Sequence, residues 1–215
     1  MQRALTLHQT TIGKKVIMAI SGIIIVGFTV GHMLGNMNLY LGPEALNGYA
    51  KTLHDLPPLV WGTRLLLLFA FGAHIVSAAS LWGRNRQARS SRYKQHKDLT
   101  TDYAARTMYW TGPILLLYIV YHLLQFTIVP AHPGDVYRNV VEAFSNPLIA
   151  GVYIVANLAL GFHIWHGFNS AFQTLGANHP RYNNLRRDLA IAIAAAITIG
   201  NLSFPLAVQL GIVTL

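Results

Sequence analysis

Five of the ten histidines lie inside long apolar stretches, where an ionisable side chain is costly to hold. They are His32, His74, His122, His163 and His166. Neutral imidazole ligates iron, and a haem iron accepts one axial ligand from each side of the ring. A lone histidine in a membrane helix can equally form a hydrogen bond to a neighbouring helix. The depth of the histidines along their helices must therefore distinguish a haem site from ordinary helix contacts.

The composition indicates a chain whose solvent is lipid. Apolar residues make up 53% and charged residues 11% of the 215 residues, which fits a soluble domain poorly. The absence of cysteine excludes disulfides, thiolate-bound zinc, cysteine-ligated iron–sulfur clusters and covalent haem attachment. The net charge of +9 could suggest nucleic acid, but the basic residues lie in short loops, not in a patch interleaved with aromatic residues. We therefore expect no nucleic-acid partner.

Five stretches contain the roughly 20 apolar residues that a membrane-spanning helix needs, and none contains a carboxylate. We predict an all-α membrane protein in which residues 1–215 form a single domain. The five transmembrane helices are predicted at 16–41, 58–83, 107–130, 147–174 and 189–213. Prolines mark several of these boundaries, and Pro205 inside the last helix is expected to bend it. The first stretch lacks the cleavage pattern of a signal peptide, so we expect it to remain as the first helix.

Positive charge is unevenly divided among the connections. Lys51 and Arg138 are the only basic residues in the loops on one side. The other side carries three basic residues before the first helix, seven between the second and third, and three between the fourth and fifth: Arg3, Lys14, Lys15, Arg84, Arg86, Arg89, Arg92, Lys94, Lys97, Arg106, Arg181, Arg186 and Arg187. Because retained positive charge marks the cytoplasmic side, we expect a cytoplasmic N-terminus and an outside C-terminus.

Depth sorts four of the histidines into two layers. At about 1.5 Å per residue, His32 lies roughly 24 Å and His122 about 22 Å along helices that run outward, in the outer part of a ~30 Å core. His74 and His163 lie roughly 24 Å along helices that run inward, in the cytoplasmic half. The layers are separated by about 15 Å. We therefore predict a bundle enclosing two b-type haems, the outer one between His32 and His122 and the inner one on His74.

The second ligand of the inner haem stays open at this point. His163 and His166 are three residues apart and share a helix face, so depth does not choose between them. The histidine that does not bind iron could meet a haem propionate, a quinone or water.

Other residues in the predicted helices are candidates for contacts with the cofactors. Arg64, the only intramembrane cation, lies roughly 9 Å from the outer end of its helix and could pair with a propionate or quinone, or reach the outer surface. Ser21 shares the face of His32 and could bond the edge of the inner haem or its own helix. Four glycines of the first helix could give a ring room or allow close helix packing: Gly22, Gly27, Gly31 and Gly35.

Four of the predicted helices carry distinctive motifs. They are IGKKVIMAISG and GHMLGN in the first, WGTRLLLLFAFGAHI in the second, YH in the third and GFHIWHGFNSAFQTLG in the fourth. They resemble the single-chain cytochrome b anchor of succinate dehydrogenase or fumarate reductase, complex II. The resemblance spans nearly the whole chain and implies five helices with one haem ligand on each of the first four. It favours His163 over His166 as the inner ligand and leaves the role of His166 undetermined.

The resemblance also implies a function. The chain would transfer electrons between membrane quinone, either menaquinone or ubiquinone, and a flavoprotein plus iron–sulfur subunit on the cytoplasmic face of the inner membrane. It would thus belong to a succinate:quinone oxidoreductase, with the dicarboxylate chemistry on the flavoprotein. The quinone site stays open between two groups of protonatable residues. The outer group is Glu44, Lys51, His54, Asp55 and Arg64, and the inner group is His8, Ser21 and His166.

Three other functions would use membrane histidines differently. A cytochrome b of the bc type carries two histidines on each of two helices, whereas here four helices carry one layer-forming histidine each. A haem-free transporter lined by histidines remains the main alternative, although no predicted helix contains the acidic residue expected in such a path. A structural anchor with one haem or none is the third.

Overall fold

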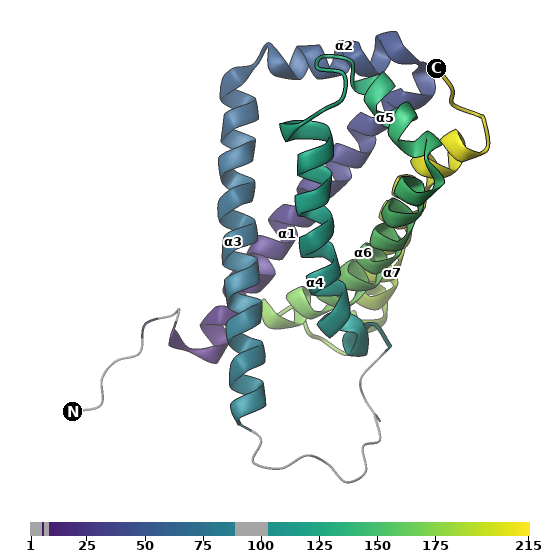
Figure 1. Ribbon diagram of the computed structural model, residues 1–215. Coiled ribbons are helices and arrows are strands. Elements are labelled where there is room, and N and C mark those ends of the chain that lie inside the picture. Colours follow the sequence, from purple (N-terminus) through teal and green to yellow (C-terminus); the bar gives the residue numbers. More distant parts are fainter. Residues whose placement is uncertain (1–5, 7–8, 89–102) are drawn as a thin grey trace.

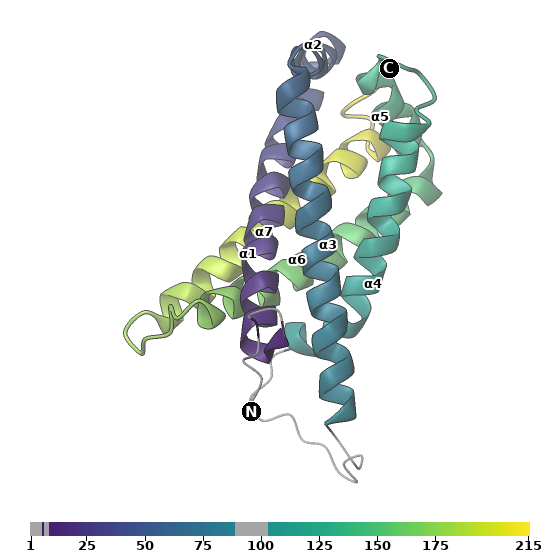
Figure 2. The ribbon, with the colours of Figure 1, turned by 90° about the vertical axis from the view of Figure 1, so that its left-hand side faces the viewer.

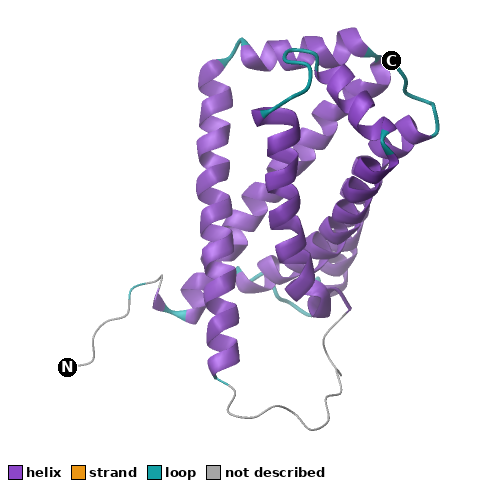
Figure 3. Ribbon diagram, viewed as in Figure 1, coloured by secondary structure: helices purple, strands orange, loops and turns teal. Residues whose placement is uncertain are grey.

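Five long helices form the bundle of the computed structural model, which describes residues 6, 9–88 and 103–215. They are α1 (Thr11–Asn36), α3 (Pro57–Gln87), α4 (Tyr103–Leu123), α6 (Pro147–Thr174) and α7 (Asn183–Gln209). Figures 1 and 3 show that they run between two ends of the molecule. Each is long and apolar enough to cross a membrane, which confirms the predicted number of spanning helices.

Several helix ends differ from the prediction, and polar residues extend the first turns beyond the apolar part. α6 has the predicted limits. α1 begins at Thr11 and ends at Asn36, before the predicted 41, and α7 begins at Asn183 and ends at Gln209, before the predicted 213. The hydroxyl of Thr10 accepts a hydrogen bond from the amide of Gly13, 2.9 Å away, and so caps α1. Hydropathy alone detects only the part of a helix that lies in lipid, so these polar first turns were missed.

Short helices cover one end of the bundle. α2 (Pro43–His54) and α5 (Val136–Ser145) lie in stretches that the sequence analysis treats only as connections. η2 (Met37–Leu41, a 3-10 helix) occupies residues that were predicted as the end of the first spanning helix. Figure 1 shows α2 and α5 beside the C-terminus, at the end we call the outer end; the N-terminal side is called the inner end. Gly42, with φ of 96°, makes the sharp turn into α2.

α6 is the central helix of the bundle. It packs against α1, α4 and α7, while α3 packs mainly against α1. In Figure 2 the α6–α7 pair crosses the other three long helices at an angle. Near the outer end, buried side chains of α1, η2, α2, α5, α6 and α7 form one core cluster that includes Leu39, Val141 and Phe204.

Polar contacts join α1 and α3 at the inner end. The ammonium of Lys14 donates to the hydroxyl of Ser80, and the guanidinium of Arg84 donates to the carbonyl of Gln9 at 2.9 Å. Five of the basic residues counted above lie outside the described residues: Arg3, Arg89, Arg92, Lys94 and Lys97.

Candidate haem site

The outer histidines face each other across the bundle. The rings of His32 on α1 and His122 on α4 have centroids 5.9 Å apart, with their planes 82° from parallel. Phe28 stacks on His32 at 5.4 Å, and Tyr118 and Phe126 contact His122 at 5.9 and 5.6 Å. The pair thus lies among aromatic rings, a suitable surrounding for a flat apolar ligand.

The inner histidines meet in the same way. The ring centroids of His74 on α3 and His163 on α6 are 6.2 Å apart, with planes at 58°. Helices that run in opposite senses therefore contribute to different pairs, α1 and α4 to one, α3 and α6 to the other. The two pairs correspond to the two predicted layers.

Three of these rings have Nδ1 within hydrogen-bond distance of an oxygen atom. His74 Nδ1 lies 3.1 Å from the carbonyl oxygen of Met18, His163 Nδ1 lies 3.3 Å from the hydroxyl of Thr111, and His122 Nδ1 lies 3.3 Å from the hydroxyl of Tyr153. Histidines that bind metal commonly donate their second N–H to such an acceptor. In each case Nε2 is left for a ligand.

His32 differs from the other three. Its Nε2 lies 3.4 Å from the amide nitrogen of Asn36, one turn along the same helix. This separation is at the long limit for a hydrogen bond. Iron ligation through Nε2 requires the Asn36 side chain to turn away.

The spacing of both pairs suits an iron held between two imidazoles. Metal–imidazole bonds are about 2 Å long and a ring centroid lies ~1 Å beyond the nitrogen, so the two centroids should be about 6 Å apart. The observed 5.9 and 6.2 Å match this value. Haem is therefore compatible with the residues present.

The grouping of the ligands also favours a porphyrin over a metal held by protein alone. Over residues 6, 9–88 and 103–215, no three His, Asp or Glu side chains gather where they could hold a metal ion. A zinc or similar site built by protein side chains needs three or four ligands. Two facing imidazoles are sufficient when a porphyrin supplies the other four nitrogens.

Two helices independently give the distance between the pairs. Thr111 touches the inner pair, and His122 of the outer pair follows it by eleven residues on α4. Ser21 lies 3.4 Å from His74, and His32 follows it by eleven residues on α1. Eleven residues of α-helix rise about 16 Å and return to nearly the same face.

Ser21 and His166 lie beside the inner pair with partners of their own. The Ser21 hydroxyl donates to the carbonyl of Ile17 at 2.7 Å, which is the bond within its own helix considered above. His166 Nε2 lies 3.1 Å from the hydroxyl of Ser170. His8, the remaining candidate of the inner quinone group, lies outside the described residues.

The glycines of α1 serve different purposes. A Cβ on Gly22 would lie 3.3 Å from Cε1 of His74, and one on Gly35 would lie 2.5 Å from the Tyr49 hydroxyl. Within the described structure, nothing lies within 4 Å of a Cβ built on Gly27 or Gly31. Gly22 thus makes room for a predicted ligand, whereas Gly35 makes room for α2.

The outer candidates have contacts that do not involve the histidine pair. The Arg64 guanidinium lies over the ring of Trp61 at 5.1 Å, one turn nearer the outer end. Lys51 and Asp55 form an exposed ion pair at 2.7 Å along α2. His54 Nδ1 lies 2.8 Å from the carbonyl of Ala50, and Glu44 is in the first turn of α2. The described structure thus gives four of these five residues surface contacts of their own.

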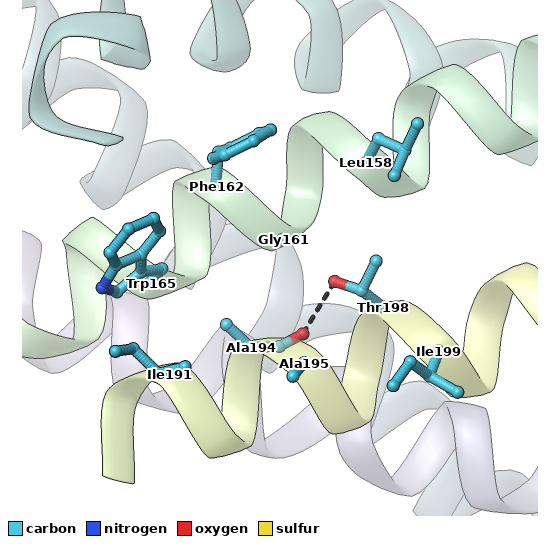
Figure 4. Close-up of a pocket in the computed structure, with 9 residues that line it drawn as sticks. All are labelled: Leu158, Gly161, Phe162, Trp165, Ile191, Ala194, Ala195, Thr198 and Ile199. Atoms are coloured by element: carbon cyan, nitrogen blue, oxygen red, sulfur yellow. Dashed lines mark hydrogen bonds between the residues drawn. The ribbon is translucent and has the colours of Figure 1, made fainter. Parts of the chain in front are cut away.

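An apolar groove of about 300 Å³ lies between α6 and α7, and Figure 4 shows the residues that line it. Gly161, Phe162 and Trp165 line it from α6. His163 projects from a different side of α6, because consecutive residues are separated by about 100° around a helix. The groove is therefore separate from the histidine site.

Sequence reasoning missed the residues that orient the imidazoles. Thr111 could have been found, since its spacing of eleven from His122 places it in the inner layer on the same face. The carbonyl of Met18 and the hydroxyl of Tyr153 carry no such signal, because their role depends on how the helices pack.

Comparison with known proteins assigns the family. The family model for the succinate dehydrogenase/fumarate reductase transmembrane subunit matches residues 83–201, more than half of the chain. The match includes His122 and His163 and follows His32 and His74 in the sequence. Neither the curated proteins nor the solved structures include a match. Members of the family are cytochrome b type anchors in complexes with soluble catalytic subunits and are not themselves catalytic. This chain belongs to the succinate dehydrogenase/fumarate reductase transmembrane subunit family and is a multi-pass membrane anchor.

Proposed function

We propose that this chain is the di-haem cytochrome b anchor of a succinate:quinone oxidoreductase. The observation that carries the proposal is the presence of two histidine pairs at 5.9 and 6.2 Å, on four different spanning helices. His32 and His122 hold the outer haem b, and His74 and His163 hold the inner one. Family membership supports the complex, and the pairs support the number of haems.

The haems supply one-electron oxidation and reduction of iron across the apolar interior. The chain's own residues hold the imidazoles at fixed heights and in one tautomer, through the Met18 carbonyl and the hydroxyls of Thr111 and Tyr153. Helix α6 contributes to both sites, through His163 and Tyr153, so it links the inner pair rigidly to the outer pair. A separation of about 16 Å between the pairs gives two stations along the membrane normal.

The proposed orientation places the inner end in the cytoplasm. Lys14, Lys15, Arg84, Arg86, Arg181, Arg186 and Arg187 lie at that end among the described residues, and retained positive charge marks the cytoplasmic side. The flavoprotein and iron–sulfur subunits would dock there, against a basic face. Electrons would pass between them and menaquinone or ubiquinone in the inner membrane.

A reduced-minus-oxidised spectrum of the purified protein, with haem quantified per chain, tests the proposal. We expect two b-type haems per chain. If the protein shows no b-type spectrum after expression with sufficient haem, the result would favour the haem-free transporter. One haem per chain would favour a structural anchor that binds a single haem.

Single substitutions test the pairing. His32→Ala and His122→Ala should remove or perturb one haem, and His74→Ala and His163→Ala the other. His54→Ala is the matched control, since that histidine is exposed on α2 and bonds its own helix. If His32→Ala and His74→Ala affected the same haem, the assigned pairs would be wrong.

A further inference from the structure

Tyr153 stands between a predicted iron ligand and an amide. Its hydroxyl lies 3.3 Å from His122 Nδ1 and donates to Oε1 of Gln125 at 2.9 Å. A phenol has one proton, so donation to Gln125 leaves the Tyr153 oxygen to accept from His122. The proton of His122 is then on Nδ1, and Nε2 carries the lone pair that can bind a metal.

The tyrosine is held firmly in this position. Only 4% of its surface is exposed. Its ring contacts those of Tyr118, Phe144 and Phe126 at 5.2, 4.9 and 5.9 Å, and Asn157 donates to its backbone carbonyl at 2.8 Å. A ring packed on several sides keeps its hydroxyl at one place, which is what orientation of a ligand requires.

A change of helix type sets the position of Gln125. Immediately after α4, residues Leu124–Ile128 form a π-helix, in which the amide of Val129 donates to the carbonyl of Leu124 at 2.9 Å. Such segments are rare and occur frequently at functional sites. This one begins two residues after His122, so the ligand and the amide that completes its hydrogen-bonded chain share one short stretch.

The inner pair has only a weaker form of this hydrogen-bonded chain. Ser21 donates to the Ile17 carbonyl at 2.7 Å, but its hydroxyl lies 3.4 Å from His74 Nδ1, at the long limit for a hydrogen bond. His163 Nδ1 meets the hydroxyl of Thr111, whose other neighbour is the sulfur of Met108 at 3.9 Å, a weak acceptor. His74 Nδ1 meets a backbone carbonyl. A hydroxyl that donates to an amide oxygen is a stronger acceptor than one that does not, because successive hydrogen bonds polarise each other.

We propose that Tyr153 and Gln125 are positioning residues that fix the tautomer of His122 and strengthen it as an iron ligand, and so lower the midpoint potential of the outer haem separately from the inner one. The inference rests on the proposed function. A stronger acceptor on Nδ1 makes the imidazole more basic, and a more basic ligand favours the oxidised iron. Loss of the hydrogen bonds from His122 to Tyr153 and from Tyr153 to Gln125 therefore makes the outer haem easier to reduce.

Redox titration of the purified di-haem protein tests this, with each haem followed by its own absorption and electron paramagnetic resonance signals. Tyr153→Phe keeps the ring and removes the hydroxyl; we expect the ratio of reduced to oxidised outer haem at a fixed potential to rise about threefold, or about 30 mV. Gln125→Leu should shift the same haem in the same direction by less. The inner midpoint should stay unchanged in both.

Two controls separate positioning from general packing effects. Tyr121→Phe makes the same change on a ring 6.0 Å from that of Tyr153, and we expect no shift. Thr111→Val should shift the midpoint potential of the inner haem only.

Two outcomes distinguish failure of the proposed function from failure of this inference. Wild-type protein without haem contradicts the proposed function. Two haems with an unshifted outer midpoint in both Tyr153→Phe and Gln125→Leu contradict only this inference. If Tyr153→Phe loses the outer haem, Gln125→Leu decides alone: a shift supports the inference and no shift overturns it.

Discussion

The ring of Tyr49 on α2 lies directly against the backbone of Gly35 on α1. A Cβ at residue 35 would lie 2.5 Å from the Tyr49 hydroxyl and 2.8 Å from Cζ of its ring. No such approach is possible for a residue with a side chain, so Gly35→Val must push α2 off the outer end. We expect a loss of about 1–3 kcal/mol, the usual cost of overpacking, measured as a lower thermal unfolding midpoint in detergent.

Gly27→Val is the matched control for this effect. Within the described structure, no atom outside the adjacent backbone of α1 lies within 4 Å of a Cβ at residue 27. The same substitution in the same helix should therefore leave the midpoint nearly unchanged. Equal destabilisation by both variants would show that α1 tolerates no β-branched residue, and that the Tyr49 contact is not the cause.

Gly22 provides a second test, directed at the inner haem. A Cβ there lies 3.3 Å from Cε1 of His74, and the added methyl groups of valine would come closer still. Displacement of the imidazole costs ligation, so Gly22→Val should weaken retention of the inner haem on the order of tenfold and spare the outer one. Haem content and the two spectral components are the measurements. Loss of both haems together would indicate a general folding defect.

The number of spanning helices could be predicted because lipid imposes a simple rule on length and apolarity. The short helices α2 and α5 could not, because they lie at the outer end and mix polar and apolar residues. Asn139, for example, is buried and donates to the carbonyls of His132 and Asp135 at 2.7 and 2.8 Å. Such contacts depend on the folded loop, which hydropathy does not describe.

The candidate site also has a part that the sequence predicts and a part that it does not. The meeting of His32 with His122 follows from residue number, helix rise and alternating direction. The same rule places the partner of His74 in the inner layer, but only the family resemblance favoured His163 over His166. The partners of their Nδ1 atoms depend on rotation of each helix about its axis. A serine such as Ser21 can bond its own helix or a neighbouring one, and sequence does not distinguish these outcomes.

The pKa values of two acidic residues at the outer end predict that the stability of the fold depends on pH. The hydrogen bond from the Arg138 side chain, followed by that from His132, lowers the pKa of Glu142 below its ordinary 4.5. The backbone amide of Arg138, then the Asn47 amide, lowers the pKa of Asp135 below 3.8. A carboxyl with a lowered pKa stabilises the fold above its unfolded pKa and loses this contribution as pH falls through the folded value.

The loss should therefore begin near pH 4.5 and continue below it. Glu142→Gln removes the charge that Arg138 and His132 contact at 2.7 and 2.6 Å. We expect this variant to have a lower thermal midpoint than wild type near neutral pH, with the difference narrowing in acid. Glu44→Gln removes the same charge at the same end and is the control for the change in net charge. A constant difference between wild type and Glu142→Gln at every pH would contradict the assignment.

Arg64 is predicted to act on the outer haem through its charge. A cation near a haem favours the reduced iron, so Arg64→Leu should lower the outer midpoint potential by tens of millivolts, the order expected for a unit charge about 10 Å away. Arg64→Lys retains the charge and should keep the outer midpoint potential close to that of wild type.

In the structure the guanidinium of Arg64 lies over the ring of Trp61, and binding of a propionate would require it to move away from that ring. Lys51→Gln removes an exposed cation at the same end and should leave both midpoints in place. An unchanged outer midpoint in Arg64→Leu would mean that the arginine stays with Trp61 at the membrane surface and pairs with no propionate.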